Sequence, residues 1–474
     1  MNENKIKEIT SRDNNFSDWY TDVVKNADLV DYSNVKGSMI IRPYGYAIWE
    51  NMVKELDRMF KETGHLNVQM PMFIPESLFN IEKEHVKGFA PEVAVVTEGG
   101  NEVLDEKMII RPTSEVLFCD HFKKIINSYR DLPLLYNQWC TIVRWEKETR
   151  PFLRSREILW QEGHTMHATE EEARAETQRM LKIYETFMKE YLAIPVITGK
   201  KTEKEKFSGA EESYTLEAMM YNGVALQNGT SHYFGQKFSK VFGIEFLNSN
   251  NELVNPYQTS WGVSTRMIGG LIMTHSDDHG LVLPPNIAPV QVAIIPIGSD
   301  ERMDLFIETI KEDLNAKSIT YTILNSDKSP GFKFAEAEIK GYPIRLEIGN
   351  RDLQKSVVTL VRRDTLEKII VPMAEVIIHI EHLLIDIQSN LYNKALVRRD
   401  SMIYTANNYD ELATVTKDKQ GFIIVNLCDD SSCENQIKED FGLKTRCILE
   451  QKVTAKCICC DHDASYSVYI GKQY

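Results

Sequence analysis

The hydrophobic residues of two segments recur at the spacing of an amphipathic helix. Residues 44–62 place their large apolar side chains on one side, and Gly64 is positioned to end the helix. Residues 169–191 show the same periodicity, with Thr169 and Glu172 at the spacing of a capping box. Both patterns predict helices that pack on a core, and we assign no chemistry to the second.

Extended patterns and proline-rich breaks divide the rest of the chain. The first helix is followed by a β-like stretch over residues 65–74. Prolines crowd into residues 284–289, and the apolar run 290–297 that follows is typical of a buried strand. Helical and strand patterns then alternate to about Pro372, which indicates a compact α/β domain. A helical stretch over residues 377–396 leads into a cysteine-bearing tail.

These breaks predict three domains, because 474 residues exceed what one hydrophobic core usually holds. We place the domains at residues 1–285, 286–375 and 376–474. The first mixes helices and strands as an α+β domain, the second is α/β, and the third is a small α/β domain. Hydrophobic residues make up 43% of the chain and charged residues 26%, which favours an ordinary globular protein over a fibrous or disordered one.

Charge and the N-terminal segment narrow the function class and the location. A net charge of −14 argues against indiscriminate binding to DNA, which depends on neutralising phosphates, but it leaves room for a specific nucleic-acid partner held by local basic patches. Residues 1–20 are polar and mixed in charge, so we expect no secretion signal. No apolar run approaches the ~20 residues of a membrane span. We therefore expect a cytoplasmic protein with no membrane partner.

Two charged strand-like segments carry the first chemical signal. Arg144 and Glu146 share one face of the first, and Trp160, Glu162 and His164 share one face of the second, because residues two apart in a strand point the same way. An arginine-rich segment joins the two. Charges on a central strand are costly to bury without partners, so the pattern favours a polar pocket with cations aimed at an anionic ligand. A solvated surface hairpin would also fit this pair taken alone.

Two further segments favour a binding pocket over a solvated surface hairpin. Arg111-Pro-Thr-Ser-Glu115 brings an arginine, two hydroxyls and a carboxylate around a proline turn. Thr259–Arg266 places hydroxyls and small residues just before an arginine. In this order the segments resemble the catalytic domain of class II aminoacyl-tRNA synthetases, and most of all the prolyl-tRNA synthetases of the archaeal/eukaryotic-like type. The pieces that carry the resemblance are Lys36-Gly37, Pro43-Tyr44-Gly45, Arg111 to Glu115, Arg144 to Lys147, Arg150 to Arg154, Trp160 to His164, Thr230 to His232 and Ser260 to Arg266.

The resemblance covers nearly the whole chain and implies a fold and a reaction. It implies an antiparallel class II sheet in the first domain, an anticodon-binding second domain and a zinc-binding third domain. The reaction would be the ATP-dependent attachment of L-proline to tRNA(Pro) through a prolyl-adenylate, with Mg²⁺ bridging the ATP phosphates. The helix of residues 44–62 and the strand after it match the family's dimer-forming motif, which implies a homodimer. The segment between His164 and Ser260 has no room for an editing domain.

Two other functions stay open beside this one. A non-catalytic synthetase-like RNA-binding or regulatory protein is the alternative, although it would have no use for buried cations such as Arg144 and Arg266. A class II synthetase for threonine or serine is disfavoured, because the catalytic domain lacks a His/Cys zinc constellation.

The resemblance also implies which residues act. Arg144 would bridge the α-phosphate and the proline carboxylate, and Arg266 would lie across the adenine and reach the γ-phosphate, because a planar, permanently charged guanidinium grips both anions. ATP would contact Arg144, Glu146, Arg154, Ser155, Gln227, Thr230, Ser264 and Arg266. Proline would contact Thr113, Glu115, Arg144, Trp160, Glu162, His164, His232 and Ser260. The anticodon would be read by Glu338, Arg345 and Asp352.

One position departs from the family pattern. Where the second hairpin strand usually carries a phenylalanine that stacks on adenine, this chain has Ile158. An aliphatic side chain covers the base without π-stacking, which is worth about 1–3 kcal/mol per base in nucleic-acid sites. We therefore expect Ile158 to weaken ATP binding without preventing the reaction.

The cysteines are unevenly distributed, with six of eight in the last fifth of the chain. Without a secretion signal, such a cluster favours a metal over disulfides, and unliganded thiols are the plain alternative. By resemblance, Cys428, Cys433, Cys457 and Cys459 form a closed, structural Zn²⁺ site. Three further residues compete as ligands: Cys447, Cys460 and His462.

Overall fold

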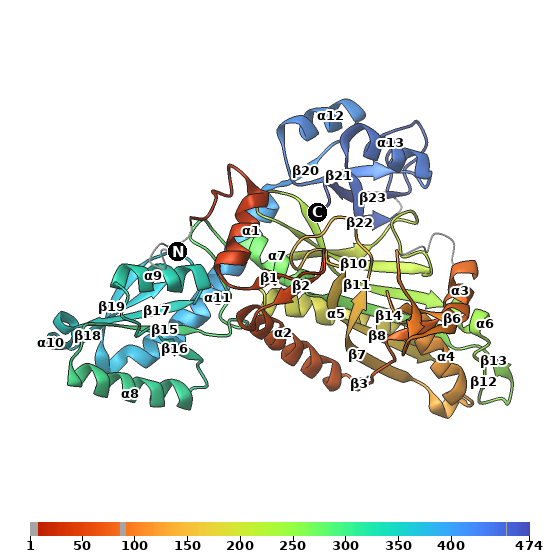
Figure 1. Cartoon of the computed structure of the whole chain (residues 1–474). Helices are drawn as coiled ribbons and strands as arrows, with labels where there is room; N and C mark the ends of the chain where they lie inside the picture. Colours follow the sequence, from red (N-terminus) through yellow and green to blue (C-terminus); the bar gives the residue numbers. More distant parts are fainter. Residues whose placement is uncertain (1–7, 86–91, 452) are drawn as a thin grey trace.

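The computed structural model describes residues 8–85, 92–451 and 453–474, so residues 1–7 and 86–91 of the predicted catalytic domain and residue 452 of the predicted third domain lie outside it. The described chain forms three bodies (Figure 1). A large central body holds a long sheet, a second body lies at one end, and a third covers the top of the central one in this view. The long helix α11 (Val376–Ser401) runs from the second body toward the third.

The central body is built on a seven-stranded sheet with the order β3-β7-β8-β14-β11-β10-β9. All neighbours are antiparallel except β3 and β7, which run parallel. The predicted α+β domain on an antiparallel sheet is therefore confirmed. The strands are β3 (Leu66–Asn67), β7 (Leu134–Val143), β8 (Glu157–His167), β9 (Val196–Lys200), β10 (Glu212–Met219), β11 (Ala225–Gly235) and β14 (Tyr257–Ser264).

The face of this sheet opposite the polar one is covered by the apolar sides of two amphipathic helices. The predicted helices are present as α2 (Pro43–Glu62) and α5 (Glu170–Glu190), and the Thr169 hydroxyl caps α5 by accepting from the Glu172 amide at 3.2 Å. The buried ring of Trp261 packs against Phe60 of α2, with centroids 5.0 Å apart. Gly163 on the neighbouring strand makes room for this ring, because a Cβ there would lie 2.0 Å from it.

The stretch predicted as one β segment over residues 65–74 divides between two sheets. β3 joins the seven-stranded sheet, while β4 (Phe73–Pro75) pairs with β6 in a three-stranded sheet. Pro71 lies between them, and a proline cannot donate a ladder hydrogen bond.

The other elements of the central body are short or peripheral. Between β8 and β14, the described chain holds only α5, three strands of the main sheet, α6 and a small hairpin, so no separate editing domain is present there. The remaining elements are α1 (Phe16–Asn26), β1 (Val30–Tyr32), β2 (Met39–Ile41), α3 (Glu76–His85), β5 (Ala94–Gly99), β6 (Glu102–Ile110), α4 (Glu115–Ile125), η1 (Tyr129–Asp131), α6 (Lys237–Phe242), β12 (Phe246–Leu247), β13 (Leu253–Val254) and α7 (Arg266–His275).

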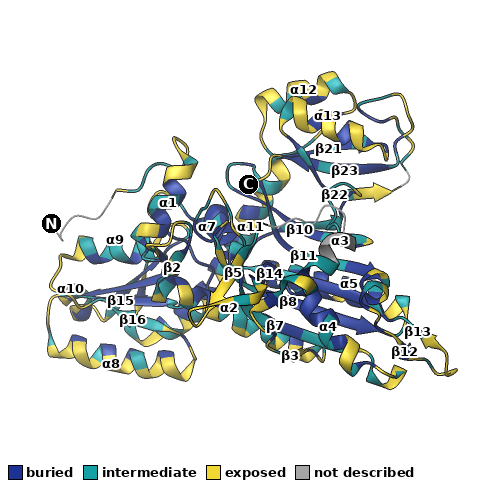
Figure 2. Ribbon diagram, turned by 45° about the vertical axis from the view of Figure 1, so that its right-hand side comes forward, coloured by how far each residue is buried: buried dark blue, intermediate teal, exposed yellow. Residues whose placement is uncertain are grey.

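The second body is an α/β domain with a five-stranded sheet of order β16-β15-β17-β18-β19. The predicted buried strand is β15 (Val292–Ile297), which runs parallel to both of its neighbours. Its other elements are α8 (Glu301–Ala316), β16 (Tyr321–Ile323), α9 (Pro330–Lys340), β17 (Ile344–Gly349), α10 (Asn350–Gln354), β18 (Val357–Arg362), β19 (Lys368–Pro372) and η2 (Met373–Glu375). Buried residues follow the sheets of all three bodies, while outer faces such as that of α8 are exposed (Figure 2).

Helix α11 starts where we placed the third domain, yet its buried residues Val376, Ile380 and Ile387 belong to the core of the second. The third body has its own core, which begins at Ala406, around a sheet of order β20-β21-β23-β22. Its elements are β20 (Ile403–Thr405), α12 (Tyr409–Asp418), β21 (Phe422–Leu427), α13 (Ser431–Phe441), β22 (Lys444–Gln451) and β23 (Tyr466–Gly471).

Across the described ranges, we find no helix with the length and apolar character needed to cross a membrane.

Candidate active site

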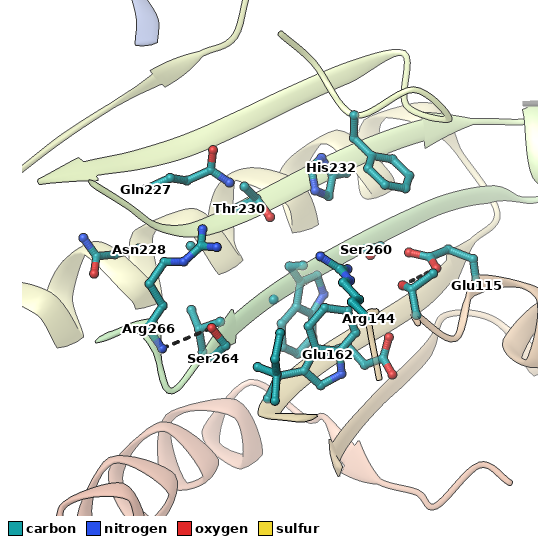
Figure 3. A pocket seen from close by; sticks show the side chains of 18 of the residues that line it. Glu115, Arg144, Glu162, Gln227, Asn228, Thr230, His232, Ser260, Ser264 and Arg266 are labelled. Carbon is teal, nitrogen blue, oxygen red and sulfur yellow. Dashed lines mark hydrogen bonds between the residues drawn. The ribbon is translucent and has the colours of Figure 1, made fainter. Parts of the chain in front are cut away.

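A cavity of about 320 Å³ lies on the polar face of the seven-stranded sheet (Figure 3). Its floor comes from β8, β11 and β14, and its walls come from the turn before α4, the end of β7 and the segment after β9. The lining residues are Thr113, Glu115, Arg144, Ile158, Trp160, Glu162, Lys201, Glu205, Phe207, Gln227, Asn228, Gly229, Thr230, His232, Ser260, Trp261, Gly262, Val263, Ser264 and Arg266.

Strand register brings the lining residues of separate segments together. Glu162 pairs with Gly262, and Trp160 pairs with Ser264, across β8 and β14. His232 of β11 pairs with Ser260 of β14. Cross-strand partners point to the same face, so residues far apart in sequence converge on one floor.

Two carboxylates with opposite pKa shifts occupy one end of the cavity. Burial raises the pKa of Glu115, although His164 and the Thr113 hydroxyl, 2.5 Å from a Glu115 oxygen, oppose the shift. Burial also acts to raise the pKa of Glu162, but hydrogen bonds outweigh it and the net shift is downward. These come from His164 at 3.1 Å and from Ser114 and Gln138 at 2.5 and 2.6 Å. The pair therefore offers one ionised acceptor and one carboxyl that a cationic ligand would help to ionise.

His164 lies behind the cavity and does not line it. Its ring is fully buried, stacks on Phe118 with centroids 4.2 Å apart and bonds to Glu162. We predicted a proline contact for His164; in the structure its ring bonds to Glu162, which does line the cavity.

Two arginines face the other part of the cavity. Arg144 follows β7, and its Nε donates to the Pro112 carbonyl at 3.1 Å while its guanidinium lies 5.2 Å from the Trp160 ring centroid. Arg266 begins α7, and its Nε donates to the Leu153 carbonyl at 3.3 Å. In Figure 3, Arg144 lies between Arg266 and Glu115.

Neither guanidinium forms a salt bridge with a carboxylate among the described residues, so both charges are poorly compensated. Burial lowers the pKa of Arg144, against the opposing carboxylates of Glu115 and Glu146. Burial, with the nearby positive charges of Arg144 and Arg154, lowers the pKa of Arg266 to about 10. Two crowded cations in a sheltered cavity indicate a site for a multiply charged anion.

Three residues predicted to contact ATP stand outside the cavity. Glu146 and Arg154 lie on the hairpin connection, 3.9 Å apart, and both are partly exposed. The Ser155 hydroxyl donates to the Glu157 carbonyl at 2.5 Å and lines a different cavity, of about 250 Å³. All three belong to the connection between β7 and β8, and the charges of Glu146 and Arg154 still lie close enough to Arg266 to shift its pKa. The other predicted ATP residues and Ile158 line the cavity as expected.

The lining residues without a predicted role include Lys201, Glu205, Phe207 and Asn228. Three of them belong to the irregular segment after β9, where no periodicity or motif marks a site. Asn228 lies beside the predicted Gln227 on β11, at a bulge in the pairing with β10, and the pattern of the strand could have suggested it.

The residues predicted to read the anticodon fall at two places in the second body. Glu338 of α9 accepts a hydrogen bond at 2.7 Å from Arg345 of β17. The Arg345 guanidinium also donates to Glu347 at 2.7 Å and lies 4.6 Å from the Phe334 ring centroid. Asp352 caps the start of α10 instead, by accepting from the Gly349 amide at 3.0 Å.

A four-cysteine cluster lies in the third body: Cys428, Cys433, Cys457 and Cys460, with all sulfur atoms within 4.8 Å of one another. The fourth member differs from our prediction, since Cys460 takes the place of Cys459, whose sulfur points to the Cys433 carbonyl at 3.5 Å. Three of the sulfur–sulfur distances are 3.7–3.8 Å. A tetrahedron of thiolates at a Zn–S distance of about 2.3 Å has edges of about 3.8 Å, so the cluster fits zinc.

Comparison with known proteins agrees with this geometry. Residues 97–275 match the family model of the tRNA synthetase class II core domain (G, H, P, S and T). Residues 291–383 match an anticodon binding domain, and residues 409–474 match the C-terminal domain of prolyl-tRNA synthetase.

Full-length relatives share more than half of the residues. A proline--tRNA ligase 2 of Bacillus cereus is 56% identical over 476 residues, covering 100% of both chains. A proline--tRNA ligase of Clostridium novyi is 54% identical over 472 residues, covering 99% of this chain and 98% of the relative. The crystal structure of prolyl-tRNA synthetase from Cryptosporidium parvum, complexed with halofuginone and AMPPNP, is 38% identical; its TM-score is 0.94, and the match covers 98% of this chain and 99% of that chain.

Proposed function

Because this chain belongs to the prolyl-tRNA synthetases, which are class II proline–tRNA ligases, we propose that the sheet-face cavity is where its proline and ATP react. The full-length relatives support the activity, and the cavity supports the place. The observation that carries the proposal is the charge arrangement of the cavity, with carboxylates at one end, Arg266 toward the other and Arg144 between them, neither arginine in a described salt bridge. Proline carries a secondary ammonium and a carboxylate, and ATP carries the phosphates.

The two arginines supply the chemistry of adenylate formation. A proline carboxylate oxygen attacks the α-phosphorus of ATP, and pyrophosphate leaves in line. Arg144, near the carboxylate end, is placed to hold the proline carboxylate and the α-phosphate together, and Arg266 to hold the adenine and the γ-phosphate. Little covalent help is needed, so alignment and fixed positive charge account for the acceleration. Mg²⁺, which class II synthetases use with ATP, would supply further charge neutralisation at the phosphates.

The remaining lining residues divide between the two substrates. We assign Gln227, Thr230 and Ser264 to ATP, with Ile158 covering the adenine. Thr113, Glu115, Trp160, Glu162, His232 and Ser260 form the proline pocket. Burial, aided by the Lys201 charge, lowers the pKa of His232 to about 3, so His232 acts as a neutral hydrogen-bonding group and transfers no proton at physiological pH.

Proline binding is expected to weaken as the pH falls through the raised pKa of Glu115. Above that pKa the carboxylate is ionised and accepts from the prolyl ammonium; below it the carboxyl is neutral and the charge interaction is lost. The KM for proline should rise by up to about ten-fold per pH unit in that window. Steady-state exchange kinetics over a pH series measures the effect.

The matched control for this pH dependence is Glu115→Gln, which keeps the size and removes the titration. Its KM for proline should be higher at neutral pH and flat across the same window. A pH dependence that survives in Glu115→Gln would assign the titration to another group.

The catalytic proposal is tested by proline-dependent pyrophosphate–ATP exchange, run with each of the twenty amino acids. An active proline–tRNA ligase exchanges with proline far above the others. A non-catalytic RNA-binding protein shows no exchange with any amino acid, and a threonine or serine enzyme exchanges with its own substrate.

The rest of the molecule serves tRNA binding and stability in our proposal. We assign the base edges of an unstacked anticodon to the ion pair of Glu338 with the buried Arg345, near Phe334, while the capping role of Asp352 makes it a secondary candidate. The four-cysteine cluster would hold one structural Zn²⁺, with all four ligand positions taken by thiolates and none left for a substrate. We keep the homodimer and the cytoplasmic location as predictions.

A further inference from the structure

The third body packs directly on the polar face of the catalytic sheet, the same face that carries the cavity. Its strand β22 crosses β9 at Gly199, where a Cβ would lie 2.8 Å from the Ile448 carbonyl oxygen. Gly199 pairs with Thr215, which in turn pairs with the cavity residue Thr230. The tail domain is therefore a neighbour of the cavity on a shared surface.

A buried ion pair crosses this contact. Arg446 of β22 donates from Nε and Nη2 to one oxygen of Glu217 on β10, at 3.0 and 2.6 Å. The side chains are 1% and 0% exposed, so a removed partner would leave a costly unpaired charge. Glu217 pairs across the sheet with the cavity residue Gln227, which places the carboxylate on the cavity's face.

The other oxygen of Glu217 faces Lys201, a lining residue that the mechanism above does not use. The Lys201 ammonium lies 3.9 Å from that oxygen, and its side chain is 7% exposed. Burial lowers the pKa of Lys201, against the negative charge of Glu217. Within the described chain the ammonium has this ion pair and no shorter hydrogen bond, so its donors stay available to a ligand in the cavity.

The residue after Lys201 is tied to the same domain. The Thr202 hydroxyl donates to Glu434 at 3.1 Å, and Glu434 also accepts from Thr445 at 2.8 Å. Glu434 directly follows Cys433, a member of the four-cysteine cluster, on α13. The segment that begins at Lys201 is thus bonded directly to the tail domain at Thr202 and indirectly, through Glu217, at Lys201.

We propose that Lys201 is a further substrate-contacting residue in adenylate formation, and that Arg446 of the C-terminal domain is a positioning residue that acts on it through Glu217. Lys201 follows β9, which is one edge of the sheet, and Arg144 follows β7, which is next to the other edge strand, so the two cations approach the cavity from opposite sides. The anions available between them are the proline carboxylate and the phosphates of ATP. The inference rests on the proposed function, and it makes the cysteine domain part of the catalytic site.

The test compares Lys201→Met, Arg446→Met and the double variant in proline-dependent exchange. Lys201→Met should lower kcat by about 10²-fold, because it removes a charge contact to the reacting anions. Arg446→Met should lower it by a similar factor, because a displaced group loses about 10²-fold in rate. The double variant should be no slower than the slower single variant, because both changes act on one cation.

The matched control is Arg399→Met, which removes another arginine between the C-terminal part of the chain and β9. Arg399 donates to the Val196 carbonyl at 3.3 Å and is not among the lining residues, so its loss should leave the exchange rate within about 2-fold. Hydrogen exchange over residues 200–206 gives a readout besides activity. It should increase in Arg446→Met and on metal chelation, and stay unchanged in Arg399→Met.

Near-normal exchange by Lys201→Met would overturn the proposal, even where Arg446→Met fails to fold. Multiplicative losses in the double variant would overturn the link between the two residues. Failure of the proposed function is distinguishable from both, because the unmodified protein would then show no proline-dependent exchange at all.

Discussion

Arg144→Ala is expected to reduce proline-dependent pyrophosphate exchange by about 10²–10³-fold or more, the loss typical for one removed transition-state contact. The loss should appear in kcat more than in the KM for either substrate, because the guanidinium holds two anions whose charge redistributes only in the transition state. Single-turnover adenylate formation with proline and ATP measures the chemical step directly.

The fold of Arg144→Ala should be unaffected. The side chain has no described salt bridge, and its contacts are one carbonyl and one ring. Arg144→Lys is the matched control, since it keeps the charge and loses the planar fork; its rate should fall between those of alanine and arginine. An alanine variant with near-normal exchange and an unchanged melting temperature would remove Arg144 from the mechanism.

Cys433→Ser is expected to abolish metal binding and to unfold the C-terminal domain while the other two domains stay folded. Structural zinc sites contribute apparent binding free energies of about 10–16 kcal/mol in small metal-dependent domains. Here the ion would link Cys428 and Cys433 to Cys457 and Cys460. All four cysteines belong to the small core of the C-terminal domain or pack against it. Elemental analysis should fall from about one equivalent of zinc per chain to near zero, and proteases should cut beyond α11.

The structure also supplies a sharp control for the metal site. Cys460→Ser should behave like Cys433→Ser, whereas Cys459→Ser should keep the metal, because the Cys459 sulfur lies outside the four-sulfur group. Retention of zinc by Cys460→Ser together with its loss from Cys459→Ser would reverse the assignment. An unmodified protein without metal, with all six tail thiols titratable in the native state, would contradict the site itself.

Local patterns along the chain were sufficient for much of the fold. The ends of α2 and α5 followed from apolar periodicity and from the Thr169 cap, which depend on neighbours within one helical turn. Alternation of side chains in β8 placed Trp160 and Glu162 on the sheet's polar face, and the strand period of two residues needs no tertiary information.

The sequence was insufficient where the outcome depends on distances between segments that are far apart along the chain. His164 shares the strand face of Glu162, and only the fold shows that its ring stacks on Phe118 of α4 and is absent from the cavity lining. Cys459 and Cys460 are adjacent in sequence, and only the turn after β22 decides which sulfur meets Cys428. No sequence pattern marks Lys201 as a site residue. The role that we propose for it depends on its contacts with Glu217 and, through Glu217, with Arg446, which lie in other parts of the chain.

The sequence by itself therefore determined the family, the reaction and the arginines that we assign to it, because ordered motifs and strand alternation are properties of the chain. Only the tertiary structure showed which predicted residues line the cavity and which four cysteines lie together. It alone showed that the C-terminal domain packs against the catalytic sheet. Those outcomes depend on packing between segments hundreds of residues apart, such as Glu217 and Arg446, and no local pattern encodes that packing.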